Sequence, residues 1–228
     1  YTTLFRSKYG PYLQNLKETE TTIVWVSNKP SIGWVELAPD DGSNFYQKER
    51  SRYFDSKNGV KNTSLIHSVK ISDLKPGTTY RYRVYSQEIL DHQGVEVIYG
   101  RIAATDVWSK KPLCFTTNDR DKKEISFTVL NDIHGRTNDI SELLNAVNYE
   151  ENDMVIYNGD MVSQSKSEEQ VFNSFMNKSI ELFAQEKPMY YARGNHETRG
   201  VFATSFQNYF SVKEPHLYFT LRQGPAFF

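Results

Sequence analysis

Three short segments of the chain carry side chains that can hold a metal ion. The segment "DIHG" contains Asp132 and His134, "NGD" contains Asp160, and "GNHE" contains Asn195 and His196. Carboxylate, imidazole and amide oxygen together suit a divalent first-row metal, and the single residue between Asp132 and His134 lets both side chains turn towards one ion from a loop. The pair Asp132 and His134 or "NGD" alone arises easily by chance and "GNHE" alone is more specific, so the prediction depends on the order of all three and their placement along the chain.

Each segment follows an apolar run that reads as a strand, and helical patterns fill the intervals. The predicted strands cover residues 125–130, 154–159 and 188–194, and the predicted helices cover residues 140–151, 167–185 and 197–210. Strands that alternate with helices build a parallel sheet, which binds ligands beyond the carboxyl ends of its strands. The pattern therefore predicts that the three segments meet at one edge of a sheet.

The first half of the chain has a different pattern. Runs rich in β-branched and aromatic residues, such as "TTIVWVS" (21–27) and "GWVEL" (33–37), are separated by turn-forming clusters, as is typical of an all-β domain. Leu74, the turn at Pro76 and then Tyr80 match the pattern of a tyrosine corner, in which a phenol bonds back to the upstream backbone. This half resembles a fibronectin type III domain, and an unrelated antiparallel hairpin is the alternative.

The charged run "NDRDKKE" (118–124) separates the two patterns. We therefore expect a multi-domain chain, with an all-β sandwich over residues 1–118 and an α/β domain over residues 119–228. The chain is long enough for each part to bury a core of its own.

Composition limits the partners. Lys and Arg total 27 and Asp and Glu total 28, so the net charge of −1 gives no indication of nucleic acid as a partner. The single cysteine, Cys114, excludes an intrachain disulfide and a cysteine-built metal site. No apolar stretch approaches the roughly 20 residues of a membrane span. The oligomeric state and the compartment stay open, with an extracytoplasmic location, periplasmic or secreted after loss of a leader, favoured.

On the three motifs, residues 125–228 resemble the first half of a calcineurin-like metallophosphoesterase. With its fibronectin-like amino-terminal half, the whole chain resembles a purple acid phosphatase. The resemblance implies a layered α-β-β-α domain, of which this chain holds the first β-α-β-α-β half. It also implies a metal-dependent hydrolase that acts on a small phosphorylated substrate, either a monoester, which we favour, or a diester or nucleotide.

The same resemblance implies a role for each motif residue. Asp132 and His134 would bind the first of two metal ions, Asp160 would bridge both ions, and Asn195 would bind the second. Between them the ions would generate a hydroxide near neutral pH. His196 would be catalytic, facing the phosphate and protonating or stabilising the leaving oxygen.

Two positions depart from the purple acid phosphatase pattern. That family is expected to carry glycine where His134 stands, and tyrosine, which gives ferric iron its colour, where Ser163 stands. One imidazole thus replaces one phenolate. Zinc, manganese or ferrous iron becomes as plausible as ferric iron, and the purple colour is not expected.

Several residues keep two interpretations. His196 either faces the substrate or only supports a metal ligand, and Arg136 either contacts the substrate phosphate or is a solvated surface arginine. His67 lies on the inward face of a predicted strand, and His216 precedes a strand, so neither is counted as a ligand.

The function of the chain also has alternatives. One is a non-catalytic binding module, in which the sandwich binds a partner or glycan and the α/β part is a degenerate metallophosphoesterase scaffold. Another is a different metal-dependent hydrolase with the same strand-end loops. Intact ligands in all three loops favour the phosphoesterase.

The carboxyl end predicts an incomplete domain. Residues 217–228, "LYFTLRQGPAFF", read as an apolar strand without a polar tail. Asp132, His134, Asp160 and Asn195 supply four of the seven ligands that the resemblance implies. We therefore expect residues 1–228 alone to bind at most one ion weakly and to have little phosphatase activity.

Overall fold

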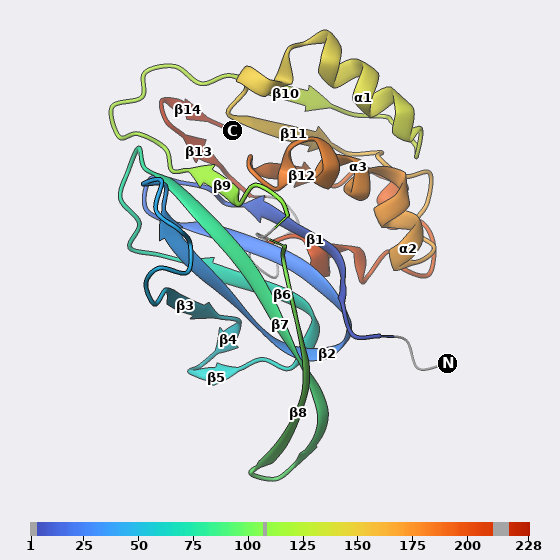
Figure 1. The fold of residues 1–228 in the computed structure, drawn as a ribbon. Helices are drawn as coiled ribbons and strands as arrows, with labels where there is room; N and C mark the ends of the chain where they lie inside the picture. Colours follow the sequence, from blue (N-terminus) through green and yellow to red (C-terminus); the bar gives the residue numbers. More distant parts are fainter. Residues whose placement is uncertain (1–3, 107–108, 212–218) are drawn as a thin grey trace.

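The computed structural model describes residues 4–106, 109–211 and 219–228. Figure 1 shows a β-rich half, ending with β9, beside a half that carries the helices and a second sheet. The predicted β-sandwich followed by an α/β domain is therefore present. His216 lies outside the described residues.

Antiparallel strands form the sandwich. They are β1 (Ser7–Gln14), β2 (Thr21–Pro39), β3 (Ser51–Phe54), β6 (Ser64–Ile71), β7 (Thr79–Gln93), β8 (Glu96–Ala104) and β9 (Leu113–Thr116). The short strands β4 (Ser56–Lys57) and β5 (Val60–Lys61) pair with each other. The β7–β8 hairpin extends away from the rest of the molecule (Figure 1).

Strand β2 serves both faces of the sandwich. Its first half pairs with β1 and β6, its second half pairs with β3 and β7, and the register is irregular between Val26 and Ser31. The strands predicted over 21–27 and 33–37 are therefore two halves of one strand. Trp25 from the first half and Val35 from the second pack into the same core, which explains why both stretches are apolar.

The predicted tyrosine corner is confirmed. The backbone N–H of Lys75 donates to the Tyr80 hydroxyl over 2.9 Å, at the turn between β6 and β7. His67 also lies where the alternation predicts: its ring is fully buried, with Nε2 2.8 Å from Ser31 Oγ. Both features belong to the framework of the sandwich.

Three parallel strands form the sheet of the second half, in the order β10 (Phe127–Leu130), β11 (Met154–Asn158) and β12 (Met189–Ala192). The first connection holds α1 (Thr137–Ala146) and the 3-10 turn η1 (Tyr149–Glu151). The second is a continuous helical stretch of α2 (Glu168–Val171), η2 (Phe172–Met176), α3 (Asn177–Ser179) and η3 (Ile180–Ala184), with π-helical bonding in η2 and η3. No helix in the described part of the chain is long and apolar enough to cross a membrane.

The predicted β-α-β-α-β order is thus present, but the helix predicted over 197–210 is not. Two short 3-10 helices, η4 (His196–Thr198) and η5 (Phe206–Tyr209), occupy that stretch. Between them Gly200 has a φ of +95°, which a right-handed helix cannot contain. Within residues 219–228, the single strand predicted for the end is a tight hairpin of β13 (Arg222–Gln223) and β14 (Ala226–Phe227).

The sandwich and the α/β half share one apolar core. Tyr12, Val24 and Val26 of β1 and β2 are buried in the same cluster as Phe172 and the residues of β11 and β12. The Tyr12 hydroxyl donates to the Tyr209 carbonyl over 2.7 Å across this contact. The two halves therefore pack as one body, and the boundary at residue 118 stays a prediction.

Candidate metal centre

The three motifs leave the parallel sheet at one edge. Asp132 and His134 follow β10, Asp160 follows β11, and Asn195 and His196 follow β12. Because the strands are parallel, their carboxyl ends meet on the same side, as the pattern predicts.

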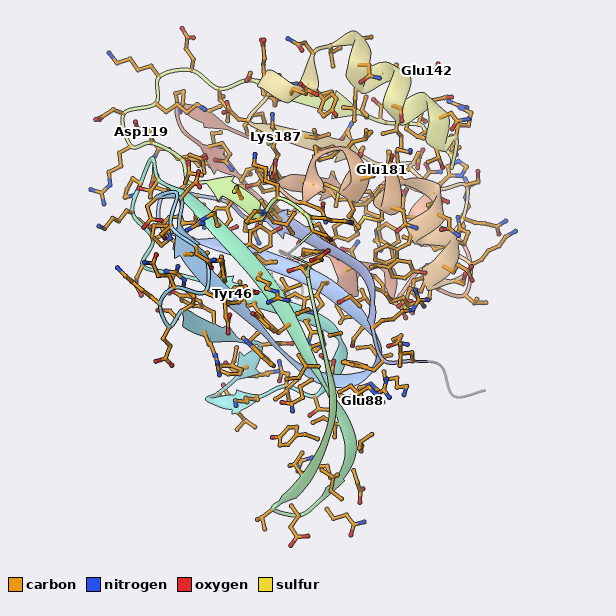
Figure 2. All side chains as sticks on the ribbon, viewed as in Figure 1. Tyr46, Glu88, Asp119, Glu142, Glu181 and Lys187 are labelled. Atoms are coloured by element: carbon orange, nitrogen blue, oxygen red, sulfur yellow. The ribbon has the colours of Figure 1, made fainter. Side chains whose placement is uncertain are left out.

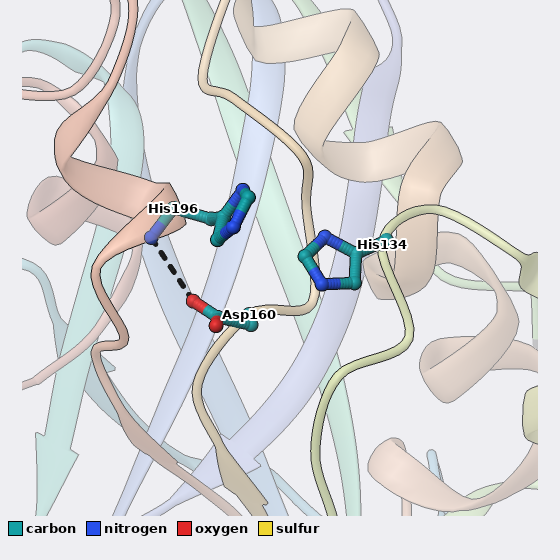
Figure 3. A group of neighbouring side chains, drawn as sticks. All are labelled: His134, Asp160 and His196. Atoms are coloured by element: carbon teal, nitrogen blue, oxygen red, sulfur yellow. Dashed lines mark hydrogen bonds between the residues drawn. The ribbon is translucent and has the colours of Figure 1, made fainter.

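Two imidazoles and one carboxylate converge there (Figure 3). His134, Asp160 and His196 each offer a ligand atom, and these atoms all lie within 4.8 Å of one another. The two histidine rings are nearly perpendicular, with centroids 4.4 Å apart. The backbone N–H of His196 donates to Asp160 Oδ1 over 3.0 Å, so the third loop is oriented by the second.

The backbone of the first two loops adopts an uncommon conformation. Asp132, His134 and Asp160 have φ values of 57°, 52° and 55°, which makes them three of the seven non-glycine residues with positive φ in the described ranges. Such conformations are unfavourable and gather at functional sites. They are held by hydrogen bonds from Asp132 N to the Gly159 carbonyl (3.2 Å) and from His134 N to the Asp160 carbonyl (3.0 Å). These bonds join the first two loops beyond the ends of their strands.

Asp132 and Arg136 lie at the border of the cluster. Asp132 Oδ1 is 3.7 Å from His134 Nε2, and the Asp132 side chain is 63% exposed, outside the group of three that converges. The Arg136 guanidinium contacts Asp139 (2.6 Å) and the Asp132 carbonyl (3.1 Å). Arg136 thus braces the first loop against helix α1, and its contact with substrate stays a prediction.

The His196 ring is held by the second loop. Its Nδ1 lies 2.9 Å from the carbonyl of Ser163, the residue that stands where the family pattern expects tyrosine. A carbonyl accepts a hydrogen bond, so Nδ1 carries the proton and Nε2 is the nitrogen left for a metal or substrate.

The amide of Asn195 can take two orientations. In one, its nitrogen donates to Asp160 Oδ2 over 3.1 Å and its oxygen accepts from Arg199 Nη2 over 2.9 Å. In the other, the Asn195 oxygen lies against the Asp160 carboxylate, an arrangement of two acceptors that a cation between them would stabilise. The His134 imidazole, the carboxylates of Asp132 and Asp160 and the amide oxygen of Asn195 form a donor set that fits a divalent metal. A bound ion would favour the second orientation.

Sequence patterns did not assign roles to two neighbours of the site. Glu197 is completely buried between the second and third loops. Arg199 is exposed, and its Nη1 lies 3.2 Å from His196 Nδ1. The signal for Glu197 was an acidic residue directly after His196 in the loop that follows the third predicted strand.

A tyrosine lies beneath the site. Burial, and after it the negative charge of Glu197, raises the pKa of Tyr191 far above its ordinary value. Its hydroxyl has no hydrogen-bond partner within the described ranges. Tyr191 therefore stays protonated and is poorly suited to act as a phenolate.

Two family models match the chain. Residues 11–110 match the purple acid phosphatase N-terminal domain, and residues 125–225 match the calcineurin-like phosphoesterase. A search of curated proteins returned no match.

A solved structure of a purple acid phosphatase resembles the chain in fold. A purple acid phosphatase, PPD1, isolated from yellow lupin (Lupinus luteus) seeds has a TM-score of 0.64 at 16% identity and covers 92% of this chain, which spans 42% of that structure. The FN1-FN3 domains of chicken CNTN1 have a TM-score of 0.30 at 14% identity, over 50% of this chain and 31% of that one. The sensor domain of the anti-sigma factor RsgI4 of Pseudobacteroides cellulosolvens has a TM-score of 0.27 at 12% identity, over 52% of this chain and 99% of that one.

Proposed function

Because the chain joins a purple acid phosphatase N-terminal domain to a calcineurin-like phosphoesterase domain, we propose that it serves the metal-dependent hydrolysis of phosphate esters, with small phosphomonoesters as substrates. The observation that carries the proposal is the convergence of His134, Asp160 and His196 at the carboxyl edge of the parallel sheet. The His134 imidazole and the Asp160 carboxylate are ordinary ligands of zinc, manganese or iron, and His196 lies close enough to them to reach a substrate bound there.

We assign the site residues as follows. Asp132 and His134 would hold one ion, Asp160 would bridge two, and Asn195 would hold the second. When bound, the two ions would supply a hydroxide near neutral pH and neutralise the negative charge of the phosphoryl group.

His196 is the proposed general acid. Its Nδ1–H donates to the Ser163 carbonyl, which fixes the ring. The imidazolium form, with a second proton on Nε2, would then give that proton to the leaving oxygen. The backbone N–H of His196 is also bonded to Asp160 Oδ1, so the acid and the bridging carboxylate keep one relative position. This arrangement supports an in-line displacement with the leaving group on the His196 side.

The proposed centre lacks a tyrosinate ligand. Ser163 occupies the position of the expected tyrosine, and Tyr191 is held in its protonated form beneath the site. The protein loaded with iron should therefore show no intense visible charge-transfer band. A purple protein would contradict the assignment.

Metal titration tests the proposal directly. Calorimetry of the chain with Zn²⁺ or Mn²⁺ should show binding that Asp160→Asn weakens by about 10- to 100-fold or more. Asp119→Asn makes the same chemical change at an exposed residue that precedes β10 (Figure 2), and it should leave binding unchanged. A chain that binds neither ion contradicts the proposed centre.

Hydrolysis of a chromogenic phosphomonoester by the complete natural protein tests the reaction itself. Turnover that Asp160→Asn abolishes supports the phosphoesterase. Metal binding without turnover on monoesters, diesters or nucleotides supports the non-catalytic alternative. The extracytoplasmic location stays a prediction, and fractionation of cells that express the protein tests it.

A further inference from the structure

The carboxylate of Glu197 connects two of the loops that carry the proposed ligands. Glu197 lies in η4, directly after His196, and is fully buried. Its Oε2 accepts from the backbone N–H groups of Asp160 (3.0 Å) and Gly194 (2.9 Å), and its Oε1 accepts from Met161 (2.8 Å) and Val162 (3.3 Å). One side chain therefore bonds to the second loop three times and to the third loop once.

These hydrogen bonds connect the second and third loops beyond the end of the sheet. The ladder between β11 and β12 stops at Asn158 and Ala192, while on the other side of β11 backbone bonds from Asp132 and His134 continue past the strand ends. Between the second and third loops, the Glu197 carboxylate fills the corresponding role. It does so because four N–H groups are turned towards one point, where only an acceptor with two oxygens can satisfy them.

A buried carboxylate has to be compensated, and here the compensation comes from the backbone. No salt bridge to Glu197 forms within the described ranges, and four backbone N–H groups donate to its two carboxylate oxygens. Charge-assisted bonds of this kind are strong, and their strength fixes the geometry of the groups that donate them.

We infer that Glu197 is a positioning residue that sets the metal affinity of the centre by fixing the second loop against the third. The inference rests on the proposed metal site. Asp160 donates its N–H to Glu197 while its Oδ1 accepts from His196 N, so the bridging carboxylate and the general acid are held through the same connection. Groups that orient metal ligands in this way change metal affinity by about 10- to 100-fold when they are replaced.

Glu197→Gln is the sharp test. Glutamine has the same size and shape but carries one oxygen and one NH₂, so two of the four N–H groups would face a donor. Calorimetric titration with Zn²⁺ or Mn²⁺ should show affinity lowered by about 10- to 100-fold, and the absorption spectrum of a bound Co²⁺ probe should change with the altered geometry. Glu142→Gln, the same substitution at an exposed residue of α1 (Figure 2), should change neither measurement.

A second control separates positioning from stability. Leu144→Ala truncates a fully buried side chain of α1 and should lower the melting temperature without changing the metal affinity of the folded protein. If Glu197→Gln behaved like Leu144→Ala, with a lower melting temperature and unchanged affinity and Co²⁺ spectrum, the positioning role would be overturned.

Hydrogen exchange tests the connection without any variant or metal. The amide protons of Asp160, Met161 and Gly194 in the unaltered chain should be protected to the level of strand β11. Exchange at the rate of exposed loop amides would overturn the inference, even if Glu197→Gln failed to fold. Protected amides together with no metal binding by the unaltered chain would instead overturn the proposed function and the claim on metal affinity, and leave the loop connection standing.

Discussion

Gly159→Ala should disturb the centre without touching any proposed ligand. Gly159 has a φ of +81°, and a Cβ added there would lie 2.6 Å from both the Cα and the backbone nitrogen of Gly194 in the third loop. Both contact atoms are backbone atoms, so no side chain can move aside to relieve the overlap. The second and third loops would have to separate.

The size of the effect follows from two terms. A left-handed conformation costs a residue with a Cβ about 1–2 kcal/mol. A relaxed carbon–carbon contact needs about 3.5 Å, so the loops would part by roughly 1 Å. A misplacement of that size typically costs about 10²-fold in activity. We therefore expect the free energy of unfolding to fall by more than about 2 kcal/mol and the metal affinity to fall by at least about tenfold.

Gly42→Ala is the matched control. Gly42 also has a positive φ, +73°, but no atom lies within 4 Å of the position of an added Cβ. It should show the conformational term alone, with metal binding unchanged. Denaturant unfolding and calorimetric metal titration measure the two variants side by side. Equal stability losses in both, with metal affinity retained in Gly159→Ala, would refute the contact argument.

Three further predictions concern other parts of the structure. His196→Ala should lower the turnover of the metal-loaded enzyme by about 10²–10⁴-fold with metal content retained, and loss of the metal instead would contradict its role as general acid. Tyr12→Phe should lower the free energy of unfolding by about 1 kcal/mol, because it removes the buried 2.7 Å bond to the Tyr209 carbonyl; an unchanged denaturation midpoint would contradict this. Burial, followed by the hydrogen bond and charge of Glu36, raises the pKa of Tyr85 to about 12. The folded state thus holds this proton more tightly than the unfolded chain, whose tyrosines titrate near pH 10. Stability that is present below about pH 10 should therefore be lost as the pH rises towards 12. Unfolding measured across that range should show a smaller loss of stability in Tyr85→Phe.

Much of the framework could be predicted from patterns because it depends on local periodicity. The apolar runs that became β10, β11 and β12 are bounded by glycines and polar ligands, and their parallel order follows from the helices between them. The helix predicted over 197–210 is absent because Gly200 has a positive φ, and backbone bonds that join Ser165 to Arg199 and Phe202 hold the chain on both sides of it. The order of elements was therefore more predictable than the type of the last one.

The details of the site were less predictable for a related reason. Asp132 and His134 lie 3.7 Å apart, and their shared metal ion stays a prediction, while only His134 joins Asp160 and His196 in the group of three that converges. The direction of a side chain after a strand depends on the left-handed backbone at each residue, which spacing does not reveal. The connection through Glu197 was hidden because its partners are backbone N–H groups, which carry no sequence signature.

The common core of the two halves limits how this protein can vary or be recombined. A fibronectin-like sandwich that served as an independent module could be exchanged for another, because its outer surfaces would meet only water. Here Tyr12, Val24 and Val26 would expose an apolar surface if the sandwich were separated, and the α/β half would lose part of its own interior. Substitutions at these positions should therefore be accompanied by changes at residues of the same cluster, such as Phe172 and Phe210. Inheritance of the sandwich and the α/β half as one unit follows from that shared interior.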